Sequence, residues 1–187
     1  MATDDVIALA VQSIVDLLRA NIPPLAPAGR ILTARPDQFD SIQNSSEPAV
    51  TVCLYRVSLN EAMRNTTQRL LPNGRLEVPR LPLNLHFLLT PWAAEAEDEF
   101  KILGRVIRIL HDYGDLRGAH LQGNSWEEDD SIQLSVESAP VDDIVRLWET
   151  THLPYRLSAL FVAHVSSLSS GQPGETVNPE SPRKPNL

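Results

Sequence analysis

Apolar residues recur at steps of three and four near the start of the chain. The repeating positions are Ile7, Val11, Ile14, Leu17 and Leu18. Polar side chains occupy the opposite side, so the spacing predicts an amphipathic helix of about four to five turns. Thr3 is its expected N-cap, and the helix is expected to stop near Asn21, just before Pro23 and Pro24.

Four later segments have the spacing of β-strands. Ala49–Leu59 carries apolar and β-branched residues on both alternating sets, which predicts a strand covered on two faces. Residues 81–89 alternate cleanly and predict a strand with one buried face, ended by Pro91-Trp92. Residues 131–137 predict a half-exposed strand and residues 155–168 a long one.

A second helix is predicted after an acidic first turn near residues 95–99. Its expected apolar stripe consists of Phe100, Leu103, Ile107 and Leu110. Lys101, Arg105 and Arg108 form a basic row that we interpret as a solvated helix face. Gly104 in mid-helix costs roughly 1 kcal/mol relative to alanine. Close packing of the helix on the sheet at Gly104 would offset this cost.

The remaining segments are shorter. We expect a short strand at residues 30–34, a polar loop at 36–48, and a loop with room for an edge strand at 113–124. A short helix begins at Pro140. Its expected packing face consists of Ile144, Val145, Leu147 and Trp148.

Asn73-Gly74 is a hairpin signal between two polar arms, residues 69–71 and 75–78, which are expected to project from the body. From residue 169 onward the chain is rich in Gly, Pro, Ser, Glu and Asn. The sequence therefore predicts one α+β domain over residues 1–168 and a flexible polar tail over 169–187. The expected architecture is a mixed or antiparallel sheet of about four to six strands packed by two main helices.

The formal net charge of −8 argues against non-specific binding to nucleic acid, which needs a basic face. Cys53 is the only cysteine, so no disulfide can form within the chain, and we interpret Cys53 as an inert core residue. Polar residues interrupt the apolar stretch near the N-terminus, which predicts neither a signal peptide nor a membrane span. We expect the chain to begin its life in the cytoplasm.

No linear motif for catalysis or cofactor binding is present. Cys53 and the five histidines show no HxxxH or CxxC spacing, so no metal site is expected. The sequence has no GxSxG, no SxxK and no phosphate-binding glycine pattern, so no catalytic residue and no cofactor is expected either. The acidic run at residues 127–130 is interpreted as a solvated loop that can also meet a basic partner. Trp126 either lies at a protein interface or folds back onto the body.

The strongest segments occur in an order that resembles a known family. These segments are Leu54-Tyr55-Arg56-Val57, Met63-Arg64-Asn65, residues 81–90, Ile102-Leu103-Gly104-Arg105, Ile109-Leu110-His111-Asp112, Leu147-Trp148 and Tyr155-Arg156-Leu157-Ser158. The succession, over residues 5–168, is similar to the N-terminal domain of the cap proteins of extracellular contractile injection systems of the antifeeding-prophage type. That family was formerly classed as a domain of unknown function.

The resemblance implies a domain similar to phage tail terminators. It implies a homo-hexameric ring that closes the baseplate-distal end of the inner tube and sheath, assembled in the cytoplasm in a particle that is released or stays intracellular. The expected partners are further copies of the chain and the sheath and tube proteins, with no nucleic acid, membrane or cofactor. The candidate partner-binding residues are Arg64, Asn65, Arg69, Arg75, Trp126, Glu127 and Glu128. Two alternatives stay open: another structural adaptor of the particle, at the baseplate or tube, and a small enzyme or ligand-binding domain without a linear motif.

Overall fold

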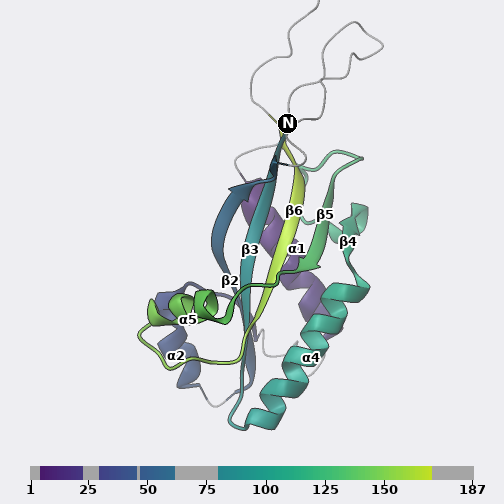
Figure 1. Ribbon diagram of the computed structural model, residues 1–187. Helices are drawn as coiled ribbons and strands as arrows, with labels where there is room; N and C mark the ends of the chain where they lie inside the picture. Colours follow the sequence, from purple (N-terminus) through teal and green to yellow (C-terminus); the bar gives the residue numbers. More distant parts are fainter. Residues whose placement is uncertain (1–4, 23–29, 46, 62–79, 170–187) are drawn as a thin grey trace, which may run out of the picture.

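A computed structural model describes residues 5–22, 30–45, 47–61 and 80–169 of the chain (Figure 1). Their centre is a six-stranded sheet in the order β1-β2-β3-β6-β5-β4. The strands are β1 (Ile31–Thr33), β2 (Ala49–Leu59), β3 (Arg80–Trp92), β4 (Asp115–Arg117), β5 (Ser131–Val136) and β6 (Ala159–Ser169). Only β1 and β2 run parallel, and every other pair is antiparallel. The predicted α+β class with a mixed sheet is confirmed.

Two long helices, α1 (Val6–Asn21) and α4 (Ala96–Asp112), cover one face of this sheet (Figure 1). Both bury apolar side chains against the inward residues of β3, which include Leu85, Phe87 and Leu89. Burial of apolar surface on this scale is the main term that holds the helices to the sheet. The predicted helix near the N-terminus is confirmed, including its end at Asn21.

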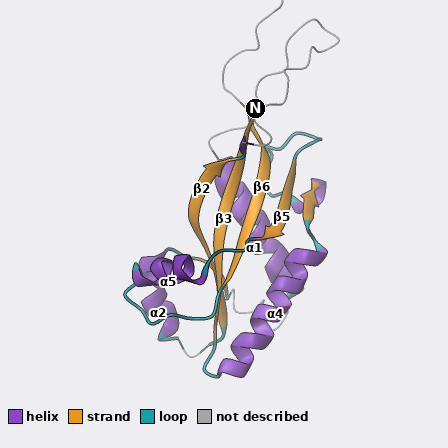
Figure 2. Cartoon of the chain, in the orientation of Figure 1, coloured by secondary structure: helices purple, strands orange, loops and turns teal. Residues whose placement is uncertain are grey.

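Two short helices lie on the other face of the sheet near one end, α2 (Phe39–Gln43) and α5 (Val141–Glu149) (Figure 2). They enclose a second core in which Phe39 and Trp148 meet Trp92 of β3. The centroid of the Phe39 ring lies 5.5 Å from the Trp92 centroid and 5.8 Å from the Trp148 centroid. Such aromatic pairs add stability beyond their buried area. Cys53 belongs to this core, as predicted, and burial raises the pKa of its thiol to about 11.

Two of the four residues predicted for the buried stripe of α4 are not buried. Leu103 and Leu110 are buried as expected, but Phe100 and Ile107 are exposed. The buried face is centred on Val106, and residues three or four positions away share its side of the helix. Gly104 consequently faces outward, and a Cβ added there would meet no atom within 4 Å. The predicted packing of Gly104 on the sheet is therefore wrong.

Other boundaries also differ from the sequence prediction. Only Ala49–Cys53 of β2 is fully buried, and the rest of the strand is partly or largely exposed. β3 ends at Trp92 as predicted, but Pro91 and Trp92 belong to the strand and still pair with β2. The polar loop at residues 36–48 contains α2, whose Phe39 supplies the apolar anchor. The last strand begins at Ala159 rather than at residue 155.

The predictions for the short helix, the edge strand and the C-terminal tail have different outcomes. Val145 lies on the outer side of α5, so it is not part of the packing face that was predicted for this helix. The edge strand for which residues 113–124 left room is present as β4. Residue 169 still belongs to β6, and the tail beyond it lies outside the described residues. The flexible tail thus stays a prediction.

Candidate interaction surfaces

The predicted polar arm lies outside the described residues. Arg64, Asn65, Arg69 and Arg75 all fall within residues 62–79, and so does the Asn73-Gly74 hairpin signal. Their role at an interface stays a prediction.

The loop before β5 carries the other candidate residues. The Trp126 indole packs against the main core and donates its Nε1–H to the Gln122 carbonyl at 2.7 Å. Asp130 is buried and accepts from the Glu127 backbone N–H at 2.7 Å, so this carboxylate shapes the turn. Glu127 and Glu128 remain exposed, which leaves their side chains accessible to a partner. Trp126 anchors the loop, and a contact of this loop with another chain stays a prediction.

A chain of hydrogen bonds crosses the outer face of the sheet and joins Ser58, His86, Glu137 and Tyr55. The Ser58 hydroxyl lies 2.9 Å from His86 Nε2, and His86 Nδ1 lies 3.0 Å from the Glu137 carboxylate. Tyr55 donates its phenol to the same carboxylate at 2.9 Å. A carboxylate can only accept, so Nδ1 carries the proton of this bond, and the Ser58 hydroxyl is the partner of Nε2. Burial, followed by the contact with Glu137, raises the pKa of Tyr55, which therefore stays a phenol.

The order serine, histidine, carboxylate is the one used by nucleophilic hydrolases. Ser58, however, lies within the β2–β3 ladder, opposite Asn84. Nucleophiles of that class lie at sharp turns or helix N-termini, where backbone N–H groups can stabilise an oxyanion. We interpret the bonds as a clamp that fastens the connection between β5 and α5 to the sheet. Glu137 also lines a hollow of about 310 Å³ beside α5.

A second polar group continues the same face. His164 of β6 lies 2.8 Å from Asn84 through Nδ1 and 3.1 Å from the Ser135 hydroxyl through Nε2. Burial and the nearby His86 lower the pKa of His164. The alternation of β3 correctly placed Asn84 and His86 on one side, but no sequence signal linked His86 to Glu137.

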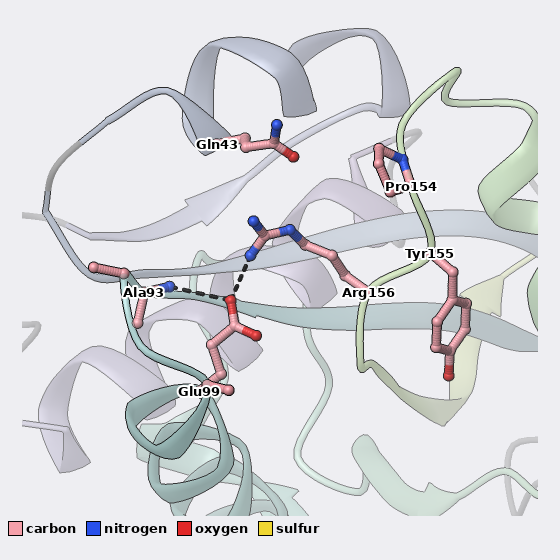
Figure 3. A pocket seen from close by; sticks show the side chains of 8 residues that line it. Gln43, Ala93, Glu99, Pro154, Tyr155 and Arg156 are labelled. Carbon is pink, nitrogen blue, oxygen red and sulfur yellow. Dashed lines mark hydrogen bonds and ion pairs between the residues drawn. The ribbon is translucent and has the colours of Figure 1, made fainter.

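Figure 3 shows a hollow of about 360 Å³ at the start of α4. Arg156 reaches across it to form an ion pair with Glu99, which also accepts from the Ala93 backbone N–H at 3.4 Å. The Arg156 guanidinium lies 5.0 Å from the centre of the Trp92 ring. Because Glu99 neutralises Arg156, this hollow offers little attraction to an anion. The ion pair between Arg156 and Glu99 fastens the segment before β6 to α4.

Two searches of the described residues bear on other classes of site. Among these residues, no three His, Cys, Asp or Glu side chains are grouped closely enough to hold a metal ion. In the same part of the chain, no helix has the length and apolar character needed to cross a membrane.

Comparison with known proteins brings in a family and two solved structures. The family described as the Pvc16 N-terminal domain matches residues 10–181. The sheath/tube terminator of the extracellular contractile injection system PVC, in its extended state, matches with a TM-score of 0.61 at 17% identity over 97% of this chain. The tube-terminating cap of the anti-feeding prophage matches with a TM-score of 0.63 at 16% identity over 95% of this chain. None of the curated proteins matches the sequence.

The present chain spans 63% and 60% of the lengths of those two solved chains. At such low identity the likeness shows that the fold is shared. It leaves the contacts of individual residues to be argued from this chain.

Proposed function

This chain belongs to the Pvc16 N-terminal domain family, and we propose that it caps a phage-tail-like contractile injection system. In this role it closes the baseplate-distal end of the inner tube and of the last sheath layer as a homo-hexameric ring. The cap stops further polymerisation and holds the sheath in its extended state. The particle assembles in the cytoplasm and is then released or kept inside the cell.

The observation that carries the proposal is the extent of the shared fold. Both solved structures align with almost the whole of this chain, at 97% and 95%, and one is a sheath/tube terminator while the other is a tube-terminating cap. The family match covers the same region independently of the coordinates. The described residues form one continuous sheet with two cores, which suits a rigid ring subunit.

The outer edge of β2 supports an assembly role. β1 pairs with β2 only from Val50 to Val52. Among the described residues, no strand pairs with the outer edge of β2 from Leu54 to Leu59, and Val57 and Leu59 are exposed there. An open edge with apolar side chains is a template for a strand from another chain. A neighbouring copy or a tube or sheath subunit can add a strand at this edge.

We also propose that the chain has no catalytic function. The cluster around His86 is the arrangement closest to a catalytic one, and its serine lies in a strand ladder. Replacement Ser58→Ala should therefore leave particle assembly and firing unchanged.

Deletion of the gene in a strain that makes the particle tests the cap proposal. We expect tails of uncontrolled length, or tubes that lack sheath, in negative-stain images, with normal length restored by the wild-type gene and by the Ser58→Ala variant. Normal, contractile particles from the deletion strain would contradict the proposal. Truncated assemblies without a baseplate would instead favour an adaptor role at the other end.

A further inference from the structure

The outer face of α4 carries features that packing among the described residues does not explain. Phe100 is 58% exposed and Ile107 is 36% exposed, although both are large and apolar. Gly104 lies between them on the same side of the helix, and a Cβ there would meet nothing within 4 Å. Alanine fits this position and favours the helix, so packing within the described residues gives no reason for glycine. A glycine on an exposed helix face lets the backbone of another element approach closely.

The same face is basic in a chain whose net charge is −8. Lys101 is held by Glu97 at 2.8 Å. Arg105 and Arg108, in contrast, form no ion pair within the part of the chain that the structure describes. Two unpaired guanidinium groups beside exposed apolar side chains form a surface suited to an acidic, partly apolar partner.

A second copy of this chain offers such a partner on α5. The outer side of α5 exposes Val141 by 68% and Val145 by 36%. Two exposed carboxylates, those of Asp142 and Glu149, accompany Val145, whereas Asp143 lines the hollow beside Tyr55. Arg146 is the only basic residue of this nine-residue helix, so its exposed face is net negative. The two helices thus pair apolar with apolar and basic with acidic.

The placement of the two helices fits a ring. α4 packs on one face of the sheet and α5 on the other. Figure 1 shows them on opposite sides of the same end of the sheet, α5 beside β2 and α4 beyond β6. A surface and its complement on opposite sides of one subunit produce a head-to-tail contact, which closes into a ring when its rotation permits.

We propose that the outer face of α4 docks on α5 of the neighbouring copy, with Phe100, Gly104 and Arg108 of one subunit against Val145, Asp142 and Glu149 of the next. This inference rests on the proposed ring and names the contact that builds it.

Cysteine cross-linking within assembled particles tests the contact. The natural Cys53 is buried, so it contributes little background. Phe100→Cys or Ile107→Cys is combined with Val145→Cys in the full chain, which covers two alignments of the helices. We expect at least one pair to give covalent oligomers up to the hexamer on oxidation, seen on a non-reducing gel. The single variants and a matched Ala119→Cys/Val145→Cys pair, with Ala119 exposed and outside the candidate surfaces, should stay monomeric.

Charge exchange supplies a second readout. Arg105→Glu/Arg108→Glu should reduce the number of capped particles at least about tenfold, because like charges then face each other. Adding Asp142→Arg/Glu149→Arg should restore capping. Gly104→Ala should raise the melting temperature of the free chain and reduce capping, a combination that a purely internal role of Gly104 would not produce.

The outcomes separate the two proposals. If the chain occupies the baseplate-distal end but neither cysteine pair cross-links copies, or if cross-links join it only to sheath or tube subunits, the α4–α5 contact is wrong and the cap stands. If the chain is absent from that end, the cap proposal fails.

Discussion

The two buried tryptophans of the second core give a matched test of the energetics. Trp92 donates its Nε1–H to the Thr51 hydroxyl at 3.0 Å. The Nε1–H of Trp148 is equally buried and finds no acceptor among the described residues. Replacing each by phenylalanine removes the same atoms, so the losses of apolar contact are similar. The difference between the two variants then reports mainly on the N–H groups, with a smaller contribution from the Arg156 guanidinium over the Trp92 ring.

The expected difference follows from these contacts. Trp92→Phe loses a hydrogen bond worth about 0.5–1.5 kcal/mol, whereas Trp148→Phe removes a donor whose burial costs about 1–3 kcal/mol. Trp92→Phe should therefore lower the free energy of unfolding by about 2 kcal/mol more than Trp148→Phe. With a slope of about 2 kcal/mol per molar urea, the unfolding midpoints should differ by roughly 1 M. Far-UV circular dichroism follows the transition without relying on tryptophan emission. Equal midpoints, or a lower midpoint for Trp148→Phe, would refute the reasoning.

Three further predictions concern single sites. Gly123 has a φ of +87°, and a Cβ added there would lie 2.7 Å from a Leu9 methyl, whereas Gly118 has a φ of +53° and open space around it. Gly118→Ala should cost about 1 kcal/mol of stability, and Gly123→Ala should lower the melting temperature further. Equal shifts of the two variants in a thermal scan would contradict this. Burial raises the pKa of Cys53 to about 11, so iodoacetamide at pH 8 should label the unfolded chain and spare the folded one, and rapid labelling of the native protein would overturn the assignment to the core. The lowered pKa of His164 means that the unfolded state binds the proton more tightly, so the free energy of unfolding should fall as the pH drops below about 6.5. His164→Gln should flatten this pH dependence, as measured by urea titrations at several pH values. An unchanged dependence of stability on pH would show that other groups cause it.

Local sequence patterns predicted helices and strands well where a single apolar face of the element packs against one core. The first helix ends at Asn21 and the second strand spans Ala49–Leu59, as predicted, because their apolar spacing is unambiguous. The predicted N-cap was Thr3, whereas Asp5 holds that position. In α4 the spacing allowed two neighbouring stripes, and contact with the sheet selected the one centred on Val106. Gly104 was therefore placed on the wrong side.

Features that depend on distant residues could not be read from the sequence. Phe39 lies in a polar segment of the sequence. It is a core residue because Trp92 and Trp148, which are distant in the sequence, pack against it. His86 and Glu137 are 51 positions apart in the sequence, and no local pattern links them. The candidate docking surface on α4 became visible only when the structure showed which apolar side chains the fold leaves exposed.

Electron cryo-microscopy of intact, extended particles tests the central claim most directly. The account predicts density for this chain as a hexameric ring at the baseplate-distal end, in contact with the last tube and sheath layers, with α4 of each subunit against α5 of the next. Density for the chain at the baseplate or along the tube would contradict the claim, as would a sealed distal end that lacks the chain.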